Sequence, residues 1–237
     1  SSTGHGIIVN DNDITIDGAG YTITGDGSDF GVDARNRDNV TIKNLNIQGF
    51  DIGVRTGNGN GGTITGNTLT SNGQDGIYAE YDVALKISNN NISSNGRNGI
   101  TLNGGGSNAL SCSVNNSGAF VVQQNTISSN TGNGIEAFNH ESVCFDQNTV
   151  NGNGYGFYVT TYNNDLFYDN TANSNTNTGF YFASGATPET FTGNTASGNG
   201  VDFEGLPDTT PPVVTVPSDM TVTTSDPIQF TNSTGTY

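Results

Sequence analysis

The sequence predicts an all-β protein: a parallel β-solenoid of about eight to nine coils, followed by a short C-terminal segment of strands. Two observations predict the solenoid, a repeat period and a set of aligned apolar columns. Gly-apolar dipeptides open successive lines of the chain at gaps of 22, 23, 23, 35, 22, 23 and 23 residues, the last gap leading to Asp202. A period near 23 residues without a helical pattern is typical of coils that bury their inner faces only by stacking. The openings are Gly31, Gly53, Gly76, Gly99, Gly134, Gly156 and Gly179.

Four apolar columns recur at fixed places in these lines. The first two lie two residues apart, on one face of a short strand, because side chains alternate between the faces of a strand. As the third column changes from Ile to Phe, the fourth changes from Ile and Leu to Ala, which keeps the filled volume of each coil similar. The columns are Ile7, Val32, Val54, Ile77, Ile100, Ile135, Phe157, Phe180 and Phe203; Val9, Ala34, Thr56, Ala79, Leu102, Ala137, Val159 and Phe182; Ile42, Ile64, Ile87, Val122, Phe145, Phe167 and Phe191; and Ile47, Leu69, Ile92, Ile127, Val150, Ala172 and Ala196. Such alignment excludes disorder for the repeat region, although its composition is polar.

An Asn stands between the third and fourth columns of nearly every coil, with Leu45 in its place in the early coil. Amides repeated at one position of stacked strands can pass hydrogen bonds along the stack at its spacing of roughly 4.7–4.8 Å. We therefore predict an asparagine ladder rather than a set of unconnected turn residues. Its members are Asn67, Asn90, Asn125, Asn148, Asn170 and Asn194.

The repeat also carries a family resemblance. Lines of the form I-x-x-N-T-[IL]-x-x-N-x-x-x-G-[IF], as in Ile64 to Ile77 and Val122 to Ile135, resemble the repeats of the pectate-lyase-like superfamily of right-handed parallel β-helices. The closest resemblance is to its NosD-like and carbohydrate-associated secreted members. It covers residues 5–205 and implies a right-handed β-helix domain at 1–205. Its implication for function is weak, because the superfamily includes lyases, hydrolases, epimerases, adhesins and proteins without chemistry.

The repeat ends before Leu206. The run from Asp208 to Val222 resembles the start of a hyalin-repeat (HYR) domain, an immunoglobulin-like extracellular sandwich, so residues 206–237 are expected to form a Pro-rich linker and its first strands. The expected strands are Val213–Val216, Met220–Thr224 and Ile228–Phe230. Because a full sandwich has about seven strands, three alternatives remain: a longer parent protein continues the domain, a neighbouring subunit completes it by strand addition, or the tail is disordered. The second alternative would join subunits into a filament.

The charge balance limits the classes of partner. With 22 acidic and 6 basic residues the net charge is -16, which argues against nucleic acid and an anionic membrane surface. It also argues against a polyanionic sugar unless calcium bridges the two, and calcium is the one cofactor that the sequence leaves open. No run of residues is apolar and long enough for membrane insertion.

The composition is typical of an extracellular or cell-surface protein, rich in Thr, Asn and Gly and poor in Lys. Four N-x-[ST] sequons are candidate N-glycosylation sites, although sequons also arise by chance in an Asn-rich chain. They are Asn39, Asn91, Asn115 and Asn232. Neither the first residues nor 201–206 form a recognisable cap, so we expect another chain or further parent sequence to cover at least one end of the solenoid.

The two cysteines also favour an extracellular location. Cys112 lies in the additional residues, about 103–119, of the one 35-residue line. Cys144 directly precedes the inward-facing Phe145, so its side chain should point outward. The insertion leads into the strand that begins at Val121, which lies one coil before the strand of Cys144. The inserted residues can therefore fold over Cys144. We predict a Cys112–Cys144 disulfide rather than two free thiols, with a contribution to stability of roughly 3–4 kcal/mol by the chain-entropy relation.

The outward face of the strand that opens each coil is the candidate binding surface. Its aromatic rings can stack on sugar rings, but cross-strand aromatic pairs also stabilise sheets without a ligand. Both interpretations stay open at this stage. The residues are Tyr78, Tyr158, Tyr181 and Phe138, with Tyr81 and Tyr162 in the following turns.

Catalytic residues are harder to find. Within the superfamily that the chain resembles, lyases use clustered carboxylates with an Arg or Lys base, hydrolases use paired or triple Asp, and epimerases show an Asp-Pro-His element, which this sequence lacks. The one mixed-charge group on adjoining coils is Asp33 with Arg35, Arg37 and Arg55, and a solvated salt bridge explains it equally well.

The two histidines, His5 and His140, are isolated in the sequence. Glu136, His140 and Glu141 form only a weak metal pattern, because this spacing is common in loops. We therefore assign neither a catalytic nor a metal site, and the sequence leans against an enzyme.

Two functions from different classes remain. The preferred hypothesis is an extracellular structural or adhesive protein of a bacterial or archaeal surface, which self-associates or joins neighbouring subunits through its C-terminal strands into a filament or larger assembly. The alternative is a carbohydrate-binding or carbohydrate-active β-helix, of the lyase or hydrolase kind, with a polysaccharide as partner.

Overall fold

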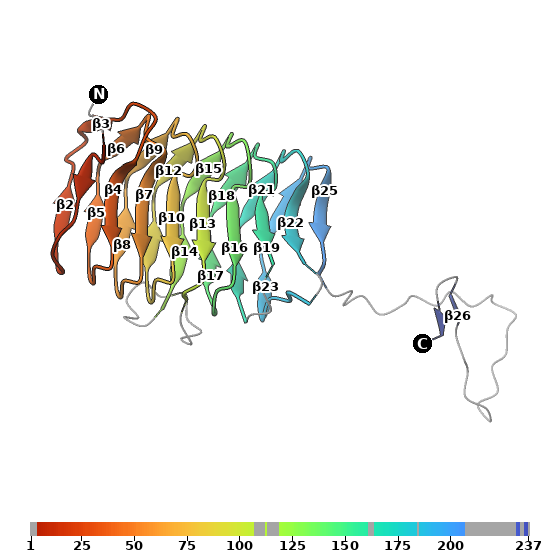
Figure 1. Ribbon diagram of the computed structural model, residues 1–237. Helices are drawn as coiled ribbons and strands as arrows, with labels where there is room; N and C mark the ends of the chain where they lie inside the picture. The colour runs from red at the N-terminus through yellow and green to blue at the C-terminus, as the bar shows by residue number, and fades with distance from the viewer. Residues whose placement is uncertain are drawn as a thin grey trace, which may run out of the picture. The chain divides into compact units, whose positions relative to one another are not determined.

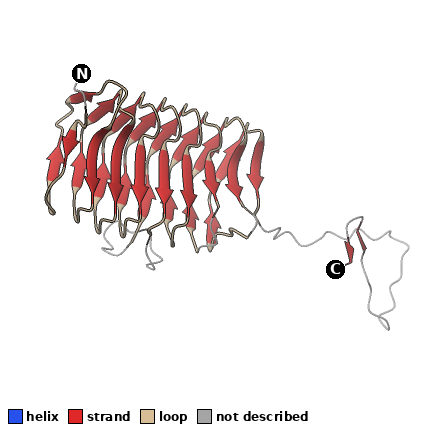
Figure 2. Cartoon of the chain, in the orientation of Figure 1, coloured by secondary structure: helices blue, strands red, loops and turns tan. Residues whose placement is uncertain are grey.

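The computed structural model describes residues 4–106, 112, 119–160, 164–183 and 185–206, together with the backbone of 231–232 and 235–236. This part of the chain contains strands and turns but no helix (Figure 2). The chain divides into two compact units, Ser1–Pro207 and Asp208–Tyr237. In the second unit, β26 (Thr231–Asn232) and β27 (Gly235–Thr236) pair antiparallel. The three strands expected between 213 and 230 lie outside the described residues.

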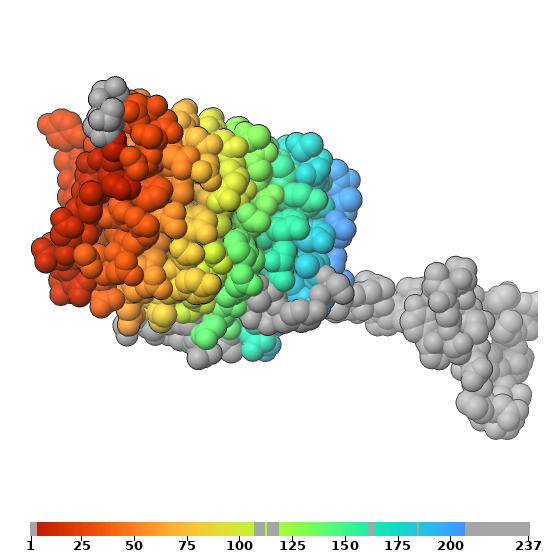
Figure 3. All heavy atoms as spheres, viewed as in Figure 1, coloured from red at the N-terminus to blue at the C-terminus, as the bar shows by residue number. Residues whose placement is uncertain are grey.

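The first unit is a stack of coils built from three parallel sheets (Figure 1). The chain passes through one strand of each sheet and then begins the next coil, so the coils follow one another in sequence order along the stack (Figure 3). Sheet A has nine strands, and sheets B and C have eight each. This architecture is the parallel β-solenoid that the repeat predicts.

The strands of the three sheets alternate regularly along the chain. Sheet A contains β1 (Ile7–Ile8), β4 (Phe30–Arg35), β7 (Ile52–Gly57), β10 (Ile77–Glu80), β13 (Ile100–Asn103), β16 (Ile135–Phe138), β19 (Phe157–Val159), β22 (Thr178–Phe182) and β25 (Val201–Glu204). Sheet B contains β2 (Thr15–Asp17), β5 (Thr41–Lys43), β8 (Thr63–Thr65), β11 (Lys86–Ser88), β14 (Val121–Gln123), β17 (Cys144–Asp146), β20 (Leu166–Tyr168) and β23 (Thr190–Thr192). Sheet C contains β3 (Thr22–Thr24), β6 (Asn46–Gln48), β9 (Thr68–Thr70), β12 (Asn91–Ser93), β15 (Thr126–Ser128), β18 (Thr149–Asn151), β21 (Thr171–Asn173) and β24 (Thr195–Ser197).

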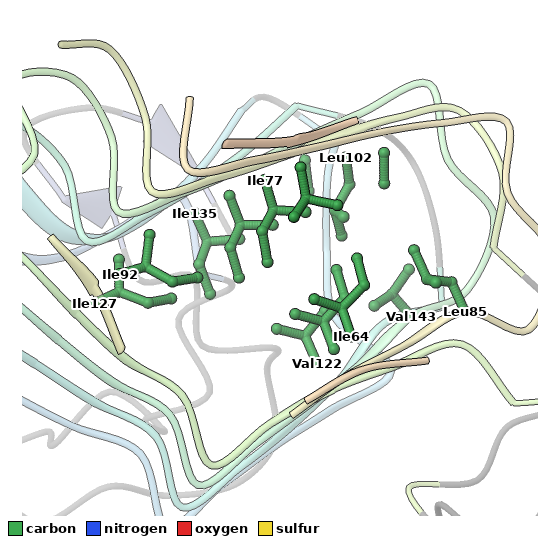
Figure 4. Packing of buried hydrophobic residues seen from close by; sticks show 14 of the residues in the cluster. Ile64, Ile77, Leu85, Ile92, Leu102, Val122, Ile127, Ile135 and Val143 are labelled. Atoms are coloured by element: carbon green, nitrogen blue, oxygen red, sulfur yellow. The ribbon is translucent and has the colours of Figure 1, made fainter. Parts of the chain in front are cut away.

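The register places the predicted apolar columns inside the stack. Ile77 pairs with Val54 of the preceding coil and Ile100 of the following one, and the other columns pair in the same way. In Figure 4 the row of sheet A that includes Ile77 lies opposite the row of sheet B that includes Ile64. The core is thus one continuous cluster along the stack. The columns read from the sequence are confirmed.

The interior becomes aromatic toward the C-terminal coils. Phe145 and Phe167 stack with ring centroids 4.6 Å apart, and Phe157 and Phe180 stack at 4.7 Å. The fourth-column residue of this region, Ala172, is fully buried. Large rings in one column are therefore accommodated by a small side chain in the other, as close packing requires.

Each coil bends sharply where a strand of sheet B or C ends. From the second coil onward, the residue directly after each of these strands has a positive φ, for example 57° at Asn89 and 57° at Ser94. Gly66 and Gly193 occupy two of these corners, where a glycine avoids the steric cost that a Cβ incurs in the left-handed region. The corner conformation explains why Asn, Ser and Gly recur in every line.

The predicted asparagine ladder runs through the corners between sheets B and C. The Oδ1 atom of Asn125 accepts hydrogen bonds from the backbone N and the Nδ2 of Asn90, both at 3.0 Å. The Nδ2 of Asn125 donates to Oδ1 of Asn148 and to the carbonyl oxygen of Ile87, again at 3.0 Å. One side chain thereby satisfies buried polar groups of three coils. The same pattern joins the members from Asn67 to Asn194.

A second ladder, not predicted from the sequence, runs through the corners between sheets C and A. The Oδ1 of Asn130 accepts from the backbone N and Nδ2 of Asn95, at 3.0 and 2.9 Å, and its own Nδ2 donates to Oδ1 of Asn153 at 2.9 Å. Each member lies five residues after a member of the first ladder, and this fixed spacing was the available signal. The members are Asn72, Asn95, Asn130, Asn153, Asn175 and Asn199.

Apolar residues begin both ladders. Leu45 occupies the ladder position of the second coil, and its backbone N donates to Oδ1 of Asn67 at 3.0 Å. Its side chain covers Gly18 of the first coil, where an added Cβ would lie 2.6 Å from Leu45 Cδ1. Phe50 has the equivalent role in the second ladder, because its backbone N donates to Oδ1 of Asn72 at 3.1 Å.

Cys112 and Cys144 form a disulfide with Cα atoms 5.3 Å apart, as the sequence predicts. Cys144 points away from the main core but is only 3% exposed. It lies in a separate small apolar cluster with Ala119, Val121 and Leu166 on the outside of sheet B. The disulfide therefore joins the insertion to a sheet that is already packed.

The end coils expose apolar side chains more than the middle coils do. In the first coil Ile8 is 54% and Tyr21 is 78% exposed, and in the last strand of sheet A Val201 is 48% and Phe203 is 41% exposed. The expected covering of an end by another chain stays a prediction.

Replacing Asn125 by Ala should lower the free energy of unfolding by at least about 3 kcal/mol, because several buried groups lose their partner at about 1–3 kcal/mol each. Urea unfolding of the purified protein measures this. Asn91→Ala is the matched control, since Asn91 is exposed in a neighbouring coil and should change stability by less than about 0.5 kcal/mol. Equal losses in the two variants would contradict a ladder that supports the fold.

Candidate functional site

All four arginines of the chain lie on the outer face of sheet A or in turns next to it, within neighbouring N-terminal coils. Arg35 and Arg55 belong to β4 and β7, Arg37 follows β4, and Arg97 precedes β13. In a protein with only six basic residues this is a local concentration of guanidinium groups. The parallel register creates it, because outward positions of successive coils lie one strand spacing apart.

The guanidinium groups alternate with aromatic rings along the stack. The Cζ atoms of Arg35 and Arg55 lie 5.2 and 5.1 Å from the ring centroid of Phe30. Those of Arg55 and Arg97 lie 5.0 and 5.8 Å from the ring centroid of Tyr78. We name these five residues the arginine–aromatic ladder. Each such contact stabilises the arrangement by about 0.5–1 kcal/mol when it is exposed.

Three of the arginines also have carboxylate partners. The pairs are Arg35 with Asp33, Arg55 with Glu80, and Arg97 with the fully buried Asp75. The mixed-charge group expected from the sequence therefore forms only in part. Arg55 pairs with Glu80 at 3.3 Å instead of with Asp33, and Arg37 donates from Nε to the carbonyl oxygen of Val9 at 3.2 Å.

Asp33 is held in its ionised form. Burial opposes its ionisation, but the hydrogen bonds from the side chain and backbone of Arg35 outweigh burial and lower the pKa of Asp33 below its ordinary value of 3.8. The hydrogen bonds to Asp33 also raise the pKa of Arg35. This pair therefore stays charged, with the guanidinium positioned beside Phe30.

Three tyrosines form a second aromatic group on the C-terminal half of the same face. The rings of Tyr158 and Tyr181 stack with centroids 4.8 Å apart and an interplanar angle of 12°. Tyr155, in the turn before β19, packs edge-on against both, at 5.0 and 5.7 Å. We name these three residues the tyrosine platform. Burial, and then the neighbouring Tyr181, raise the pKa of Tyr158 above 10.0, so its hydroxyl group stays protonated at neutral pH.

The other aromatic residues expected at this surface do not join the platform. Tyr78 belongs to the arginine–aromatic ladder, and the strands β13 and β16 separate it from Tyr158. Phe138 lies in the adjoining outward column at the end of β16. Tyr81 is 54% exposed in the turn after β10. Tyr162 lies outside the described residues. The predicted surface is therefore two aromatic groups rather than one.

Polar groups lie between these two aromatic groups. Asn98 donates from Nδ2 to Oγ1 of Thr101 at 3.0 Å and to Oε2 of Glu136. Thr101 and Glu136 are register partners in sheet A. Along the stack, the face thus carries first ion-paired arginines and aromatic rings, then polar groups, and then the tyrosine platform.

A groove of about 310 Å³ opens beside the arginine–aromatic ladder at the N-terminal coils. Its wall carries a carboxylate, two guanidinium groups and two amides, so it is predominantly polar. The lining residues are Ile8, Val9, Asn10, Asp33, Arg35, Asn36 and Arg37.

The carboxylates of this face are engaged rather than free for proton transfer. Glu80 accepts from Arg55 at 3.3 Å and from Asn103 at 3.4 Å, and Asp75 accepts from Arg97 and from the backbone N of Asn98. Within the described ranges, no three His, Cys, Asp or Glu side chains come together as metal ligands. The face is therefore built for contact more than for acid–base chemistry.

His140 is not isolated, which corrects the sequence-based expectation. Its Nε2 lies 2.9 Å from Oδ2 of Asp165, and the two residues are only 3% and 1% exposed. Asp165 also accepts from the backbone N of Val143 at 2.9 Å. The pair lies between β16 and β20 and supports the turn between two coils, so it is explained as a structural contact.

A buried carboxylate lies in the turn after β10. Asp82 is 4% exposed and accepts hydrogen bonds from Oγ1 of Thr56 at 2.6 Å and from the backbone N of Gly59 at 2.9 Å. Beside it is a void of about 10 Å³, enough for about one water molecule, which Arg37 also lines. Burial raises the pKa of Asp82 to about 6, although the two hydrogen bonds act in the opposite direction.

Two of the four sequons can be placed in the structure. Asn39 and Asn91 are both exposed, the former in a turn and the latter at the start of β12. Asn115 and the side chain of Asn232 lie outside the described residues. Glycosylation at any of the four stays a prediction.

The chain matches a known protein family over most of its length. A family model described as a right handed beta helix region matches residues 1–122 and 113–234. Among solved structures, the periplasmic alginate epimerase AlgG is similar with a TM-score of 0.58 and 14% sequence identity over 85% of this chain. The chain spans 47% of that structure's length, and at this identity the likeness concerns the fold alone. No curated protein matches the chain. The resemblance of residues 206–237 to a hyalin repeat stays a prediction.

No helix among the residues that the structure describes is long and apolar enough to cross a membrane. This finding agrees with the absence of helices from the described part of the chain.

Replacing Asp82 by Asn should stabilise the protein at pH 8 but much less at pH 4. The folded carboxyl group holds its proton up to about pH 6, whereas the unfolded one loses it near 3.8. Ionisation therefore costs the folded state stability as pH rises through this window, by up to about 3 kcal/mol. Asn keeps an acceptor for Gly59 and has no charge to bury. Urea unfolding of both proteins at the two pH values measures the difference, and a difference that does not change with pH would contradict the assignment.

Proposed function

The chain belongs to the family of right-handed β-helix proteins, and on this premise we propose that it is a carbohydrate-binding protein that holds a polysaccharide along the outer face of sheet A. The single observation that carries the proposal is the tyrosine platform, in line with the arginine–aromatic ladder on one face. Contact with a chain molecule needs such an extended surface, whereas a small molecule needs an enclosed pocket.

The tyrosine platform supplies the stacking surface for a sugar ring. Tyr158 and Tyr181 lie nearly parallel, and Tyr155 packs edge-on against them, so the rings are already held in position before a ligand arrives. Rigid aromatic side chains lose little conformational entropy on binding, and this preorganisation favours affinity. The hydroxyl groups add hydrogen-bonding capacity at the rim of the contact.

The arginine–aromatic ladder supplies selectivity for carboxylate-bearing sugars. Arginine binds carboxylates through a planar fork of donors, and the ladder holds Arg35 and Arg97 partly exposed, with side-chain exposures of 39% and 44%. The chain as a whole has a net charge of -16, which repels an anionic polymer from surfaces that lack arginines. An acidic polysaccharide would therefore lie with its charged units over the ladder and its rings over the platform.

The proposal does not include bond cleavage. The carboxylates of Asp33, Glu80 and Asp75 already accept hydrogen bonds from guanidinium groups, and Glu136 accepts from Nδ2 of Asn98. A general acid or base needs a group poised to exchange a proton with the substrate, and the pairing of Asp33 lowers its pKa. Binding is thus better supported than lyase, hydrolase or epimerase chemistry.

We further propose that the protein works outside the cytoplasm, in a secreted or surface location. The Cys112–Cys144 disulfide supports this location, because disulfides persist in oxidising compartments. A surface protein that binds polysaccharide would act as an adhesin.

A structural role without a glycan ligand is the second candidate. It is favoured by the apolar residues that the last coil exposes, Val201 and Phe203, because edge strands of this kind pair with other chains. In that case the protein would form part of a larger assembly, and the aromatic groups of sheet A would serve only to stabilise the sheet.

The binding proposal is tested with Tyr158→Ala and Tyr181→Ala against a panel of neutral and uronate polysaccharides. Each variant should weaken polysaccharide binding at least about tenfold, equivalent to about 1.4 kcal/mol, measured by isothermal titration calorimetry. Tyr21→Ala is the matched control, since Tyr21 is 78% exposed but lies directly before β3 of sheet C rather than on sheet A. If no polysaccharide binds the wild-type protein while sedimentation shows self-association, the structural role replaces this proposal.

A further inference from the structure

Asn-Gly is the dipeptide most prone to spontaneous deamidation, and this chain contains ten copies. In the reaction the backbone nitrogen of Gly attacks the side-chain carbonyl carbon of Asn, forms a five-membered succinimide and releases ammonia. Water then opens the ring to give aspartate or isoaspartate. The Asn residues are Asn58, Asn60, Asn72, Asn95, Asn98, Asn103, Asn133, Asn151, Asn153 and Asn199.

In the folded protein, every one of these ten glycine N–H groups donates a hydrogen bond to a neighbouring coil. Gly59 donates to Oδ1 of Asp82 at 2.9 Å, and the other nine donate to carbonyl oxygens. These nine bonds are Gly61 to Val83 at 2.9 Å, Gly73 to Phe50 at 2.7 Å, Gly96 to Asn72 at 2.8 Å, Gly99 to Asn133 at 2.9 Å, Gly104 to Phe138 at 2.9 Å, Gly134 to Tyr155 at 2.7 Å, Gly152 to Asn173 at 3.0 Å, Gly154 to Gly132 at 2.6 Å and Gly200 to Asn175 at 3.3 Å.

These hydrogen bonds oppose the reaction in two ways. The attacking nitrogen must lose its proton, and a proton held by an acceptor is harder to remove. The nitrogen must also turn toward its own Asn side chain, which requires the coil to open locally. Four of the ten Asn residues, Asn72, Asn95, Asn153 and Asn199, have a second constraint, because their amides belong to the second ladder.

The last of the ten sites is the weakest. The hydrogen bond of Gly200, at 3.3 Å, is the longest of the set. Among the four sites of the second ladder, Asn199 is the one that is only half-buried, because Asn72, Asn95 and Asn153 are at most 2% exposed. The strand that follows, β25, pairs with β22 on one side only in the described sheet.

We propose that the inter-coil hydrogen bonds protect the nine Asn-Gly sites that precede Asn199, here called the internal sites, in the folded protein, and that Asn199 is the modification site at which deamidation begins. Asn199 ends the second ladder, where Asp202 takes the place of the next Asn. Its Nδ2 donates to Oδ1 of Asp202 at 2.9 Å and to the carbonyl oxygen of Ala172 at 2.8 Å.

Deamidation of Asn199 would replace its attractive hydrogen bond to Asp202 by repulsion between two carboxylates. The new carboxylate can still accept from Asn175, as Asn199 Oδ1 does now at 2.9 Å. It has no N–H for Asp202 or for the carbonyl of Ala172, so three acceptors would face one another. Like charges at this distance and unpaired buried acceptors both destabilise. The strand β25, which begins at Val201, would then detach from β22.

The first experiment compares deamidation at the ten sites in folded and urea-unfolded protein. Both samples are incubated at mildly alkaline pH, and peptide mapping by mass spectrometry follows the mass change and the isoaspartate at each site. In the unfolded chain all ten sites should react at similar rates. In the folded protein Asn199 should react first, and the internal sites at least about tenfold more slowly than when unfolded. The proposal is overturned if internal sites react as fast folded as unfolded, or if any of them precedes Asn199.

The second experiment tests the structural consequence with Asn199→Asp, the product of the reaction. Hydrogen exchange of the amides of residues 201–204 should become at least about tenfold faster than in the wild type. Asn173→Asp is the matched control, because Asn173 uses its Oδ1 to accept from Ser197 at 2.9 Å and a carboxylate can do the same. In the double variant Asn199→Asp with Asp202→Asn, the repulsion is removed and slow exchange should return. Unchanged exchange in Asn199→Asp, or failure of the second substitution to restore it, would contradict the role of Asp202.

Discussion

The hydrogen bonds of the buried Asn amides are the interaction on which the rest of the structure depends. A coil with two sharp corners turns backbone polar groups toward an apolar interior. An Asn side chain at each corner carries one acceptor and two donors, so it can accept from the coil before and donate to the coil after. Asp could accept in the same place but could not donate, and a column of carboxylates would repel itself. A repeated amide is therefore the side chain that lets identical corners stack without unsatisfied groups.

The same requirement explains how the ladders end. Where the stack has no further amide to pair with, the chain uses residues with other properties. Leu45 and Phe50 place apolar side chains over Gly18 and Gly25 of the first coil, while their backbone N–H groups still serve the first amide of each ladder. At the opposite end, the carboxylate of Asp202 accepts from Asn199 and so replaces the missing amide oxygen. Each ladder thus begins at an apolar residue rather than at an Asn.

Because stacking is determined inside the coils, the outer positions are available for function. The parallel register aligns outward side chains of successive coils at one strand spacing of roughly 4.7–4.9 Å, so a like-charged column would repel itself. The sequence avoids this on sheet A by alternating guanidinium groups with rings and carboxylates. The result is a face with anchored charges at one end and stacked tyrosines at the other, which is the surface that the proposed function uses.

The sequence by itself determined the period, the four apolar columns and the first Asn ladder, because each of these follows from a position that recurs in successive lines. It also predicted the Cys112–Cys144 pairing, because the insertion that carries Cys112 enters its strand one coil before Cys144. The second ladder was equally periodic, but Asn also recurs in turns of this chain, for example at Asn44 and Asn89, and this turn role concealed its ladder role. Tyr155 and the His140–Asp165 pair are different, since they lie in turns whose lengths vary between coils. Only the tertiary structure decided that Arg55 turns to Glu80. The physical reason is that repeat spacing assigns a residue to a face and a coil, whereas the partner of a long side chain depends on its rotamer and on the groups that neighbouring coils bring within reach.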